Sequence, residues 1–411
     1  MDAYGQIASR RVATATRGGG IGRAMRGALA GLATLALAAC TTPLTGGDNP
    51  FAAGPTPAAP AGERLSEGSV PVAMLLPLTG AGQGQAAAED MRNAARLALS
   101  EFNTPDIRLT VYDTSGTPEG ASAAAQAALS EGSELIIGPL FAGSVQAAGQ
   151  VAQSRNVPVL AFSTDATVAS RGVYLMGFLP QPEVERVIDY AAQNGRRAVA
   201  ALIPQTTYGN VVEAQFRETA ARRGVRVVQV ERYPAGQPQQ AVTRIAGVAA
   251  GAAPQVDALF IPESPQGLVA VNAALQAAGF DPARVKPLGT GLWNEPSVMG
   301  LPMLQGGWYA APEQTGFQNF ASRYGQAFNE QPIRIASIAY DAVSLAAALN
   351  RTQGTQRFAE AVLTNRSGFA GVDGVFRFRP DGLSDRAHAV YEVRGGGATV
   401  VSPAPRALPD A

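Results

Sequence analysis

The stretch 70–102 constrains the fold of this chain more than any other part of its sequence. Residues 70–76 form a short, almost wholly apolar run, which is typical of a strand buried on both faces of a parallel sheet. Turn-forming residues follow at 77–84, and from 87 to 102 apolar side chains recur at helical spacing. This order predicts the opening unit of a doubly wound α/β domain, with a ligand-binding loop at the carboxyl end of the strand.

The glycines of this loop also raise the hypothesis of a dinucleotide site. Gly80, Gly82 and Gly84 alternate, but the G-x-G-x-x-G fingerprint places its third glycine elsewhere. The fingerprint also needs an acidic residue about 20 residues further on, and Asp113 comes later than that. We therefore expect a loop that lets a ligand approach backbone amides, and no nicotinamide cofactor.

Composition excludes several classes of function. The 411 residues are enough for two domains beyond a leader, and the formal net charge of zero argues against a nucleic-acid partner. With one histidine, His388, and one cysteine, Cys40, the chain can form neither an internal disulfide nor a Cys/His zinc site. His388 begins a late strand and is expected at the surface. We expect no enzyme, no cofactor and no metal.

The first 39 residues have the pattern of a secretory signal peptide. Arginines precede a short stretch of Ala and Leu that ends in small residues, and it is too short to span a bilayer. Met25 directly before this stretch would make a more ordinary leader, so we expect translation to start there. The residues Leu37-Ala38-Ala39-Cys40 resemble the bacterial lipoprotein box, which implies cleavage before Cys40 and diacylglycerol on its thiol.

The lipid would be the chain's only membrane contact. By a rule of Gram-negative lipoproteins, Thr41 in place of aspartate after the acylated cysteine implies the outer membrane, with the protein facing the periplasm. Residues 40–68 are rich in Pro, Gly, Ala and Thr without apolar periodicity, so they predict a disordered tether.

The alternation of strand and helix continues along the chain and breaks twice, at 171–180 and around 290–308. A second lobe inserted within the first explains both breaks. The predicted division is lobe 1 at 69–178 and 291–356, lobe 2 at 179–290 and 357–396, and a tail at 397–411.

The motifs of this chain resemble those of the type I periplasmic binding proteins of the leucine/isoleucine/valine-binding kind. The resemblance covers about residues 70–394, and the order and spacing of the motifs carry it: Pro77-Leu78-Thr79-Gly80, Asp113-Thr114, Ile137-Gly138-Pro139, Tyr208-Gly209, 339–343 and 371–378. It implies two doubly wound parallel-sheet α/β lobes joined by three crossovers, which close on a small ligand between them.

Two functions remain open within this resemblance. Importer subunits of the family grip a ligand carboxylate with hydroxyls and amides after the strand ending at Gly138-Pro139, and often grip its ammonium with an acid of the second lobe. Here Ala142 and Gly143 take the positions of those hydroxyls. The part of the second lobe that should supply the acid has Gly291, with Glu295 only nearby. A zwitterion is therefore expected to be poorly paired.

Residues 138–142 and 161–165 look instead like the penicillin-binding protein activators, outer-membrane lipoproteins that stimulate peptidoglycan synthases. The best-known activators carry an extra helical repeat domain before this fold, and here we expect the tether to stand in its place. The leading prediction is an activator whose partner is a peptidoglycan synthase. The alternative is the solute-binding subunit of an ABC importer, whose partner is a permease.

The predicted cleft residues lie on loops at strand ends. The acid of Asp165 is expected to cap the following helix or to pair with a ligand cation, and the hydroxyls nearby serve either turns or a ligand. The full predicted set is Leu78, Thr79, Gly80, Pro139, Leu140, Phe141, Ala142, Gly143, Ser163, Thr164, Asp165, Tyr208, Glu263, Ser264 and Gly291.

Overall fold

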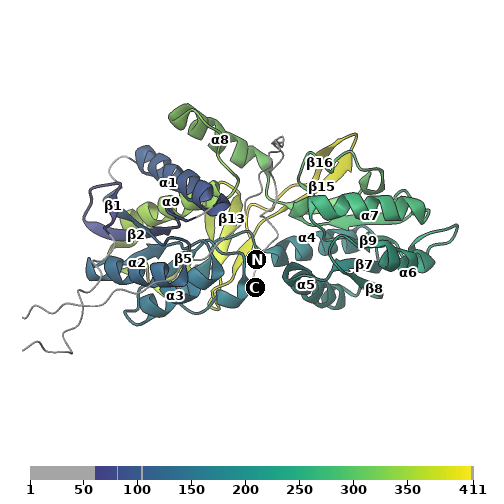
Figure 1. Cartoon of the computed structure of the whole chain (residues 1–411), viewed down its shortest axis with the longest axis horizontal. Coiled ribbons are helices and arrows are strands. Elements are labelled where there is room, and N and C mark those ends of the chain that lie inside the picture. Colours follow the sequence, from purple (N-terminus) through teal and green to yellow (C-terminus); the bar gives the residue numbers. More distant parts are fainter. Residues whose placement is uncertain (1–60, 81, 103–104, 409–411) are drawn as a thin grey trace, which may run out of the picture. The chain divides into compact units, whose positions relative to one another are not determined.

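The computed structural model describes residues 61–80, 82–102 and 105–408, which form two α/β lobes, each built on a sheet with helices on both faces (Figure 1). The predicted fold class is confirmed. The predictions for Cys40, the signal peptide and most of the tether lie outside the described residues.

The sheet of lobe 1 has six strands and is parallel except at one edge. β2 occupies an inner position and pairs in parallel with β3 and β4, which explains why its apolar run has no polar face. In spatial order the strands are β1 (Glu63–Arg64), β3 (Ile107–Asp113), β2 (Val70–Leu76), β4 (Leu135–Ile137), β5 (Val159–Ala161) and β6 (Val173–Leu175).

Small apolar side chains cover both faces of this sheet. The alanine-rich helices α2 (Pro118–Ser130) and α3 (Ala142–Gln153) pack on one face. The other face carries α1 (Gln83–Glu101), α8 (Gln314–Phe328) and α9 (Ala336–Gln353), together with a three-stranded antiparallel sheet of β12 (Phe369–Gly371), β13 (Gly374–Phe378) and β14 (Ser384–Arg386).

The sheet of lobe 2 has seven strands. In spatial order they are β16 (Gly397–Ser402), β15 (Ala389–Arg394), β11 (Trp308–Ala311), β10 (Lys286–Gly289), β9 (Ala258–Phe260), β7 (Ala198–Pro204) and β8 (Arg226–Tyr233). Helices α4 (Pro180–Gln193) and α5 (Thr207–Arg223) pack on one face, and α6 (Gln239–Ala249) and α7 (Pro265–Ala277) on the other.

Short segments complete the chain between these elements. They are the single-turn helices η1 (Ala166–Val168), η2 (Gly291–Trp293), η3 (Pro302–Leu304) and η4 (Gly354–Gln356), and the four-residue helix α10 (Glu360–Leu363).

Three crossovers join the lobes. The first crossover, 176–179, connects β6 to α4; the second, 312–313, connects β11 to α8; and the third, 387–388, connects β14 to β15. Among the described residues, no helix is both long enough and apolar enough to cross a membrane.

The strand pairing corrects the predicted lobe boundaries. β10 and β11 are short parallel strands of lobe 2, so the chain returns to lobe 1 after Ala311 and not at Gly291. β13 packs its Phe376 and Phe378 into the core of lobe 1, so residues up to the third crossover belong there and not to lobe 2. Strands of three or four residues, such as β10 and β11, are too short to show a period, so the sequence pattern did not predict them.

Two further corrections concern the ends. The predicted tether reaches residue 68, but β1 pairs antiparallel with β3 through Glu63 and Arg64, so ordered pairing starts earlier. The predicted tail starts at 397, but β16 pairs antiparallel with β15.

Candidate functional site

The polar groups of the loop after β2 form hydrogen bonds within lobe 1. The Thr79 hydroxyl donates to the Asp113 carboxylate, and the Thr79 N–H donates to Oδ1 of the same side chain over 3.2 Å. Burial opposes ionisation of Asp113, but the hydrogen bonds from Thr79 and Ser115 outweigh it and lower the pKa of Asp113. This carboxylate therefore ties two strand ends together, and Thr79 has little left for a ligand.

Residues 139–144 form the second predicted loop of lobe 1. The ring of Phe141 lies over Gly84 and Gly116, where a Cβ would come within 2.7 and 3.4 Å of it. Glycine at these positions makes room for the ring, so Phe141 braces the loops around it. The Ser144 hydroxyl donates to the Thr117 carbonyl over 3.2 Å and is buried. Leu78 and Leu140 are partly buried against the core, while Gly143 is exposed.

The third loop follows β5. Asp165 accepts hydrogen bonds from the N–H and the hydroxyl of Thr167, at 2.9 and 2.7 Å, and so caps η1. Its capping role, one of the two alternatives, is confirmed. Ser163 is buried and accepts from the Asp165 N–H, whereas Thr164 is exposed.

Glu263 of lobe 2 is engaged by its own neighbours. It accepts from the Tyr233 hydroxyl over 2.6 Å and from the N–H and hydroxyl of Ser264 over 2.6 and 2.8 Å. Ser264 also caps α7 by accepting from Gly267. These two predicted cleft residues are thus fully occupied in holding the turn between β9 and α7.

The turn after β10 gathers polar side chains from two helices of lobe 2. The Tyr208 hydroxyl, from α5, lies 2.7 Å from the hydroxyl of Thr290, which is 0% exposed. Next to it the Gly291 N–H donates to Oε2 of Glu183, from the first turns of α4, over 2.9 Å. The strands before Tyr208 and Gly291, β7 and β10, belong to the parallel part of the sheet, so both residues lie at its carboxyl edge, where α/β sheets bind ligands.

Glu183 is a second buried acid at this edge, beside Glu263, and nothing in the sequence singled it out. Its side chain is 8% exposed, and a Cβ on Gly291 would lie 2.6 Å from its Oε1. Burial raises the pKa of Glu183 to about 8, although the Gly291 N–H and the charge of Arg334 act in the opposite direction. Glu183 is therefore mostly protonated at neutral pH.

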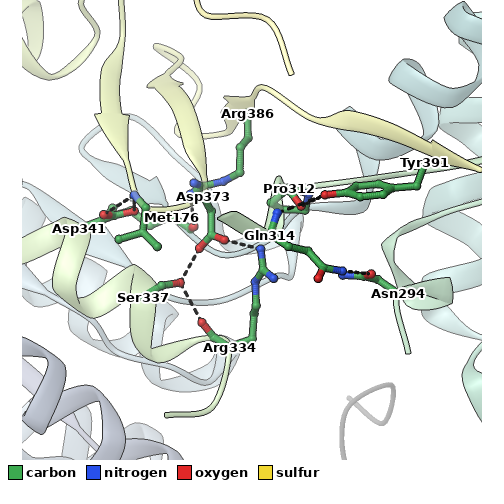
Figure 2. A network of polar contacts seen from close by, with 11 residues as sticks. Met176, Asn294, Pro312, Gln314, Arg334, Ser337, Asp341, Asp373, Arg386 and Tyr391 are labelled. Carbon is green, nitrogen blue, oxygen red and sulfur yellow. Dashed lines mark hydrogen bonds and ion pairs between the residues drawn. The ribbon is translucent and has the colours of Figure 1, made fainter. Parts of the chain in front are cut away.

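Arg334 approaches from lobe 1, in the segment between α8 and α9. One of its terminal nitrogens pairs with Asp373, which also accepts from the Ser337 hydroxyl over 2.5 Å (Figure 2). The guanidinium lies 4.6 Å from the ring centre of Phe317 and 6.0 Å from that of Phe178. Its side chain is 29% exposed, so part of this cation faces solvent.

A second arginine, Arg386, ends β14 just before the third crossover. Arg386 is buried between the rings of Phe178 and Phe376. Burial raises the pKa of the neighbouring Asp341 to about 7, against the opposing effects of Arg386 and the Val372 N–H. Asp341 accepts that N–H with both oxygens and so holds the backbone at Val372.

The prediction for His388 was wrong, because the side chain is 2% exposed. Neither ring nitrogen makes a well-formed hydrogen bond to a described residue. Burial, together with Arg386, Arg186 and Arg334, lowers the pKa of His388 to about 3, which the Arg386 backbone only partly offsets. The residue at the start of β15 is covered because the crossover runs inside the protein and not over its surface.

The predicted residues therefore divide into two groups. Most of them hold their own loops, while Tyr208 and Gly291 meet at one edge of lobe 2. Glu183, Thr290 and Arg334 were missed; a carboxylate at a helix start usually signals only a favourable dipole contact, and nothing local reveals its burial.

The chain was compared with known proteins. The family model of the periplasmic binding proteins matches residues 69–398. A putative branched-chain amino acid ABC transporter protein from Rhodospirillum rubrum is similar in structure, with a TM-score of 0.72 and 21% identity over 81% of this chain and 100% of that one. A search of curated protein sequences found no match.

Two structures with bound ligands are also similar. The transporter substrate-binding protein of Streptococcus pneumoniae in complex with isoleucine has a TM-score of 0.55 and 18% identity, over 82% of this chain and 100% of that one. The solute-binding protein from R. palustris in complex with benzoate has a TM-score of 0.55 and 17% identity, over 82% and 98%. At these identities the likeness concerns the fold. The family match, which spans most of the sequence, shows that this chain belongs to the periplasmic binding protein family.

Proposed function

We propose that this protein is the solute-binding subunit of an ABC importer and that its solute is a small molecule carrying a carboxylate. The observation that carries the proposal is the meeting of Glu183, Gly291, Tyr208 and Thr290 at the carboxyl edge of lobe 2, with Arg334 of lobe 1 close enough to act on Glu183. Ionisable groups of both lobes thus influence each other near the edge where this family places a ligand.

The similar structures support the carboxylate. Isoleucine and benzoate, the ligands named for two of them, differ in size and in their amino group but share this anion. The three similar structures are described as transporter proteins, so the importer role, which was the alternative, has more support than the activator role. A permease is accordingly the expected partner, and a periplasmic location follows from the family. The lipid anchor at Cys40 remains a prediction.

A thermal-shift screen of the purified protein tests this function. The panel is the twenty common amino acids and benzoate, followed by calorimetry on every compound that raises the melting temperature. We expect at least one compound to bind with a dissociation constant near 1 μM, about −8 kcal/mol. Gln326→Ala, in an exposed hollow near the end of α8, is the control and should bind equally well. No shift with any compound, together with binding to a purified peptidoglycan synthase, would favour the activator function instead.

A further inference from the structure

We propose that residues 402–404, which we call the C-terminal strap, restrict the movement of the two lobes by holding the second and third crossovers to lobe 2. The strap starts at the last residue of β16 and runs on beyond the sheet of lobe 2. Hydrogen bonds from the strap and its partners to both crossovers carry the inference. It goes beyond the proposed function, because it concerns the protein free of solute.

The register of β16 places the strap beside the third crossover. β16 pairs antiparallel with β15, and the register shifts within the pair: Val390 faces Ser402, whereas Tyr391 faces Val400. Val401 is therefore the extra residue of a β-bulge, and a bulge bends the strand and re-aims the side chains next to it. Ser402 consequently lies opposite a residue that follows the third crossover by two positions.

Arg186 of α4 binds the third crossover and the strap at the same time. Its Nε donates to the His388 carbonyl over 2.9 Å. Its Nη2 donates to the Ser402 hydroxyl over 2.6 Å and to the Pro403 carbonyl over 3.3 Å. Because α4 packs into the core of lobe 2, this half-buried guanidinium fixes the backbone of the crossover and the strap to one helix of that lobe.

Glu313 connects the strap to the second crossover. Prolines at 403 and 405 have no N–H, so Ala404 supplies the only backbone donor between them. This N–H donates to Oε1 of Glu313 over 2.8 Å. Glu313 is the N-cap residue of α8, yet its side chain caps none of the N–H groups of that helix. The carboxylate at the start of a lobe 1 helix is thus used to hold the chain end of lobe 2.

The strap is itself anchored on lobe 2. Val401 packs against the core that contains α4 and α5, and Ala404 packs against the core that contains α6 and α7. Hinged lobes move through changes of φ and ψ in a few residues between them. With the strap bound, Glu313 and His388 cannot swing away from lobe 2 without losing a hydrogen bond to a charged group. The free protein should therefore occupy a narrow range of lobe arrangements.

Pulsed dipolar spectroscopy of the solute-free, full-length protein tests the inference. Spin labels at Gln126→Cys on α2 and Val269→Cys on α7, both exposed, report the distance between the lobes in a Cys40→Ser background. Glu313→Ala removes the acceptor, and Ala404→Pro removes the donor. Each variant loses a charge-assisted hydrogen bond, so we expect the ratio of displaced to wild-type-like lobe arrangements to rise roughly 10-fold.

Two matched controls should leave the distance distribution unchanged. Glu119→Ala removes an exposed acid from the first turn of α2, another helix of lobe 1. Ala407→Pro places a proline at an exposed position of the same chain end, outside the strap. These variants separate the loss of the Glu313 bond from the general effect of removing a helix-start charge or adding a proline.

Three further variants show whether the residues act through the bonds described. Glu313→Gln keeps an acceptor oxygen without the charge, so its distribution should broaden less than that of Glu313→Ala, and it serves as the milder variant if the latter folds poorly. Arg186→Met frees the third crossover and should also broaden the distribution. The double variant Glu313→Ala/Ala404→Pro should match the single variants, because both remove the same bond.

Three outcomes would overturn the inference. An unchanged distribution in both Glu313→Ala and Ala404→Pro would reduce the strap to a surface covering of lobe 2. Effects that add up in the double variant would show that the two residues do not act through their bond. Equal broadening by Ala407→Pro would assign the effect to the chain end as a whole. None of these measurements involves a solute, so the importer proposal stands or fails separately, on the binding panel.

Discussion

Arg386 donates a hydrogen bond from Nη2 to the backbone oxygen of Met176 over 3.2 Å, and this bond ties the third crossover to the first (Figure 2). Its other terminal nitrogen, Nη1, is buried without a hydrogen-bond partner among the described residues. A buried cation thus lies where the lobes join, held by the rings of Phe178 and Phe376. Burial of this charge is costly, and the nearby carboxylates of Asp373 and Asp341 offset part of that cost.

The Tyr391 hydroxyl connects β15 to the second crossover. It donates to the Pro312 carbonyl over 3.3 Å and accepts from the Gln314 N–H over 3.2 Å, while its ring stacks on Tyr309. Tyr391→Phe keeps the stacking but strands both backbone groups, so we expect a loss of about 1–2 kcal/mol in the free energy of unfolding. Chemical denaturation measures it. The control Tyr190→Phe, whose ring packs on Trp308, should change stability by less than about 0.5 kcal/mol; equal losses in the two variants would contradict a special role for Tyr391.

Glu183 should make stability depend on pH. Its pKa is raised from 4.5 to about 8, so the native protein holds a proton that the unfolded chain has lost between these values. The contribution to stability is complete below pH 4.5 and is lost as pH rises to 8. Relative to Glu183→Gln, wild type should lose up to about 1.4 kcal/mol per pH unit in this window. Denaturation of both proteins from pH 5 to 9 measures the difference, and parallel curves would show that Glu183 ionises freely.

His388 should lower the stability of the protein at acidic pH. Its pKa is lowered from 6.5 to about 3, so the unfolded chain binds a proton that the native protein refuses, and stability is lost as pH falls from 6.5 toward 3. His388→Leu removes this titrating group and two ring nitrogens that make no well-formed hydrogen bond to the described residues. Relative to wild type, we expect the free energy of unfolding of the variant to rise by up to about 1.4 kcal/mol for each pH unit below pH 6.5. Thermal melts at pH 7 and pH 5 would reveal it; a variant that gains nothing at pH 5 would place His388 in contact with water.

Cys40 remains the expected lipid attachment site. In the full-length chain, Cys40→Ser should prevent acylation, because serine lacks the thiol that carries diacylglycerol. We expect the variant to be uncleaved or to leave the membrane fraction, which fractionation and intact-mass measurement will show. Unchanged mass and unchanged membrane association would refute the anchor.

Regular periodicity made the fold predictable. The buried run of β2 and the apolar faces of α1, α4 and α9 each extend over enough residues to show their period. Short elements such as β10, β11 and β14 do not. Because β11 and β14 directly precede crossovers, the predicted lobe boundaries were wrong.

The candidate site was harder to predict because it depends on contacts between distant segments. Tyr208 and Gly291 were found through a family motif and a strand end. The hydrogen bond of Glu183 comes from Gly291, which lies 108 positions away in sequence, and the charge that acts on its pKa comes from Arg334 of the other lobe. Conversely, Glu263 looked suitable for a ligand but is satisfied by Tyr233 and Ser264. Side-chain satisfaction of this kind is a property of packing and leaves no mark on the local sequence.

The most direct test of the central claim is the distance between the lobes with and without solute. Spin labels at Gln126→Cys on α2 and Val269→Cys on α7, both exposed positions on different lobes, would be introduced together in a Cys40→Ser background. Pulsed dipolar spectroscopy then measures the distance distribution in the free protein and at saturating concentration of the best-binding amino acid. A solute-binding protein that closes on its ligand should show a shift of the distribution on binding. A saturated protein whose distribution stays unchanged would contradict the account.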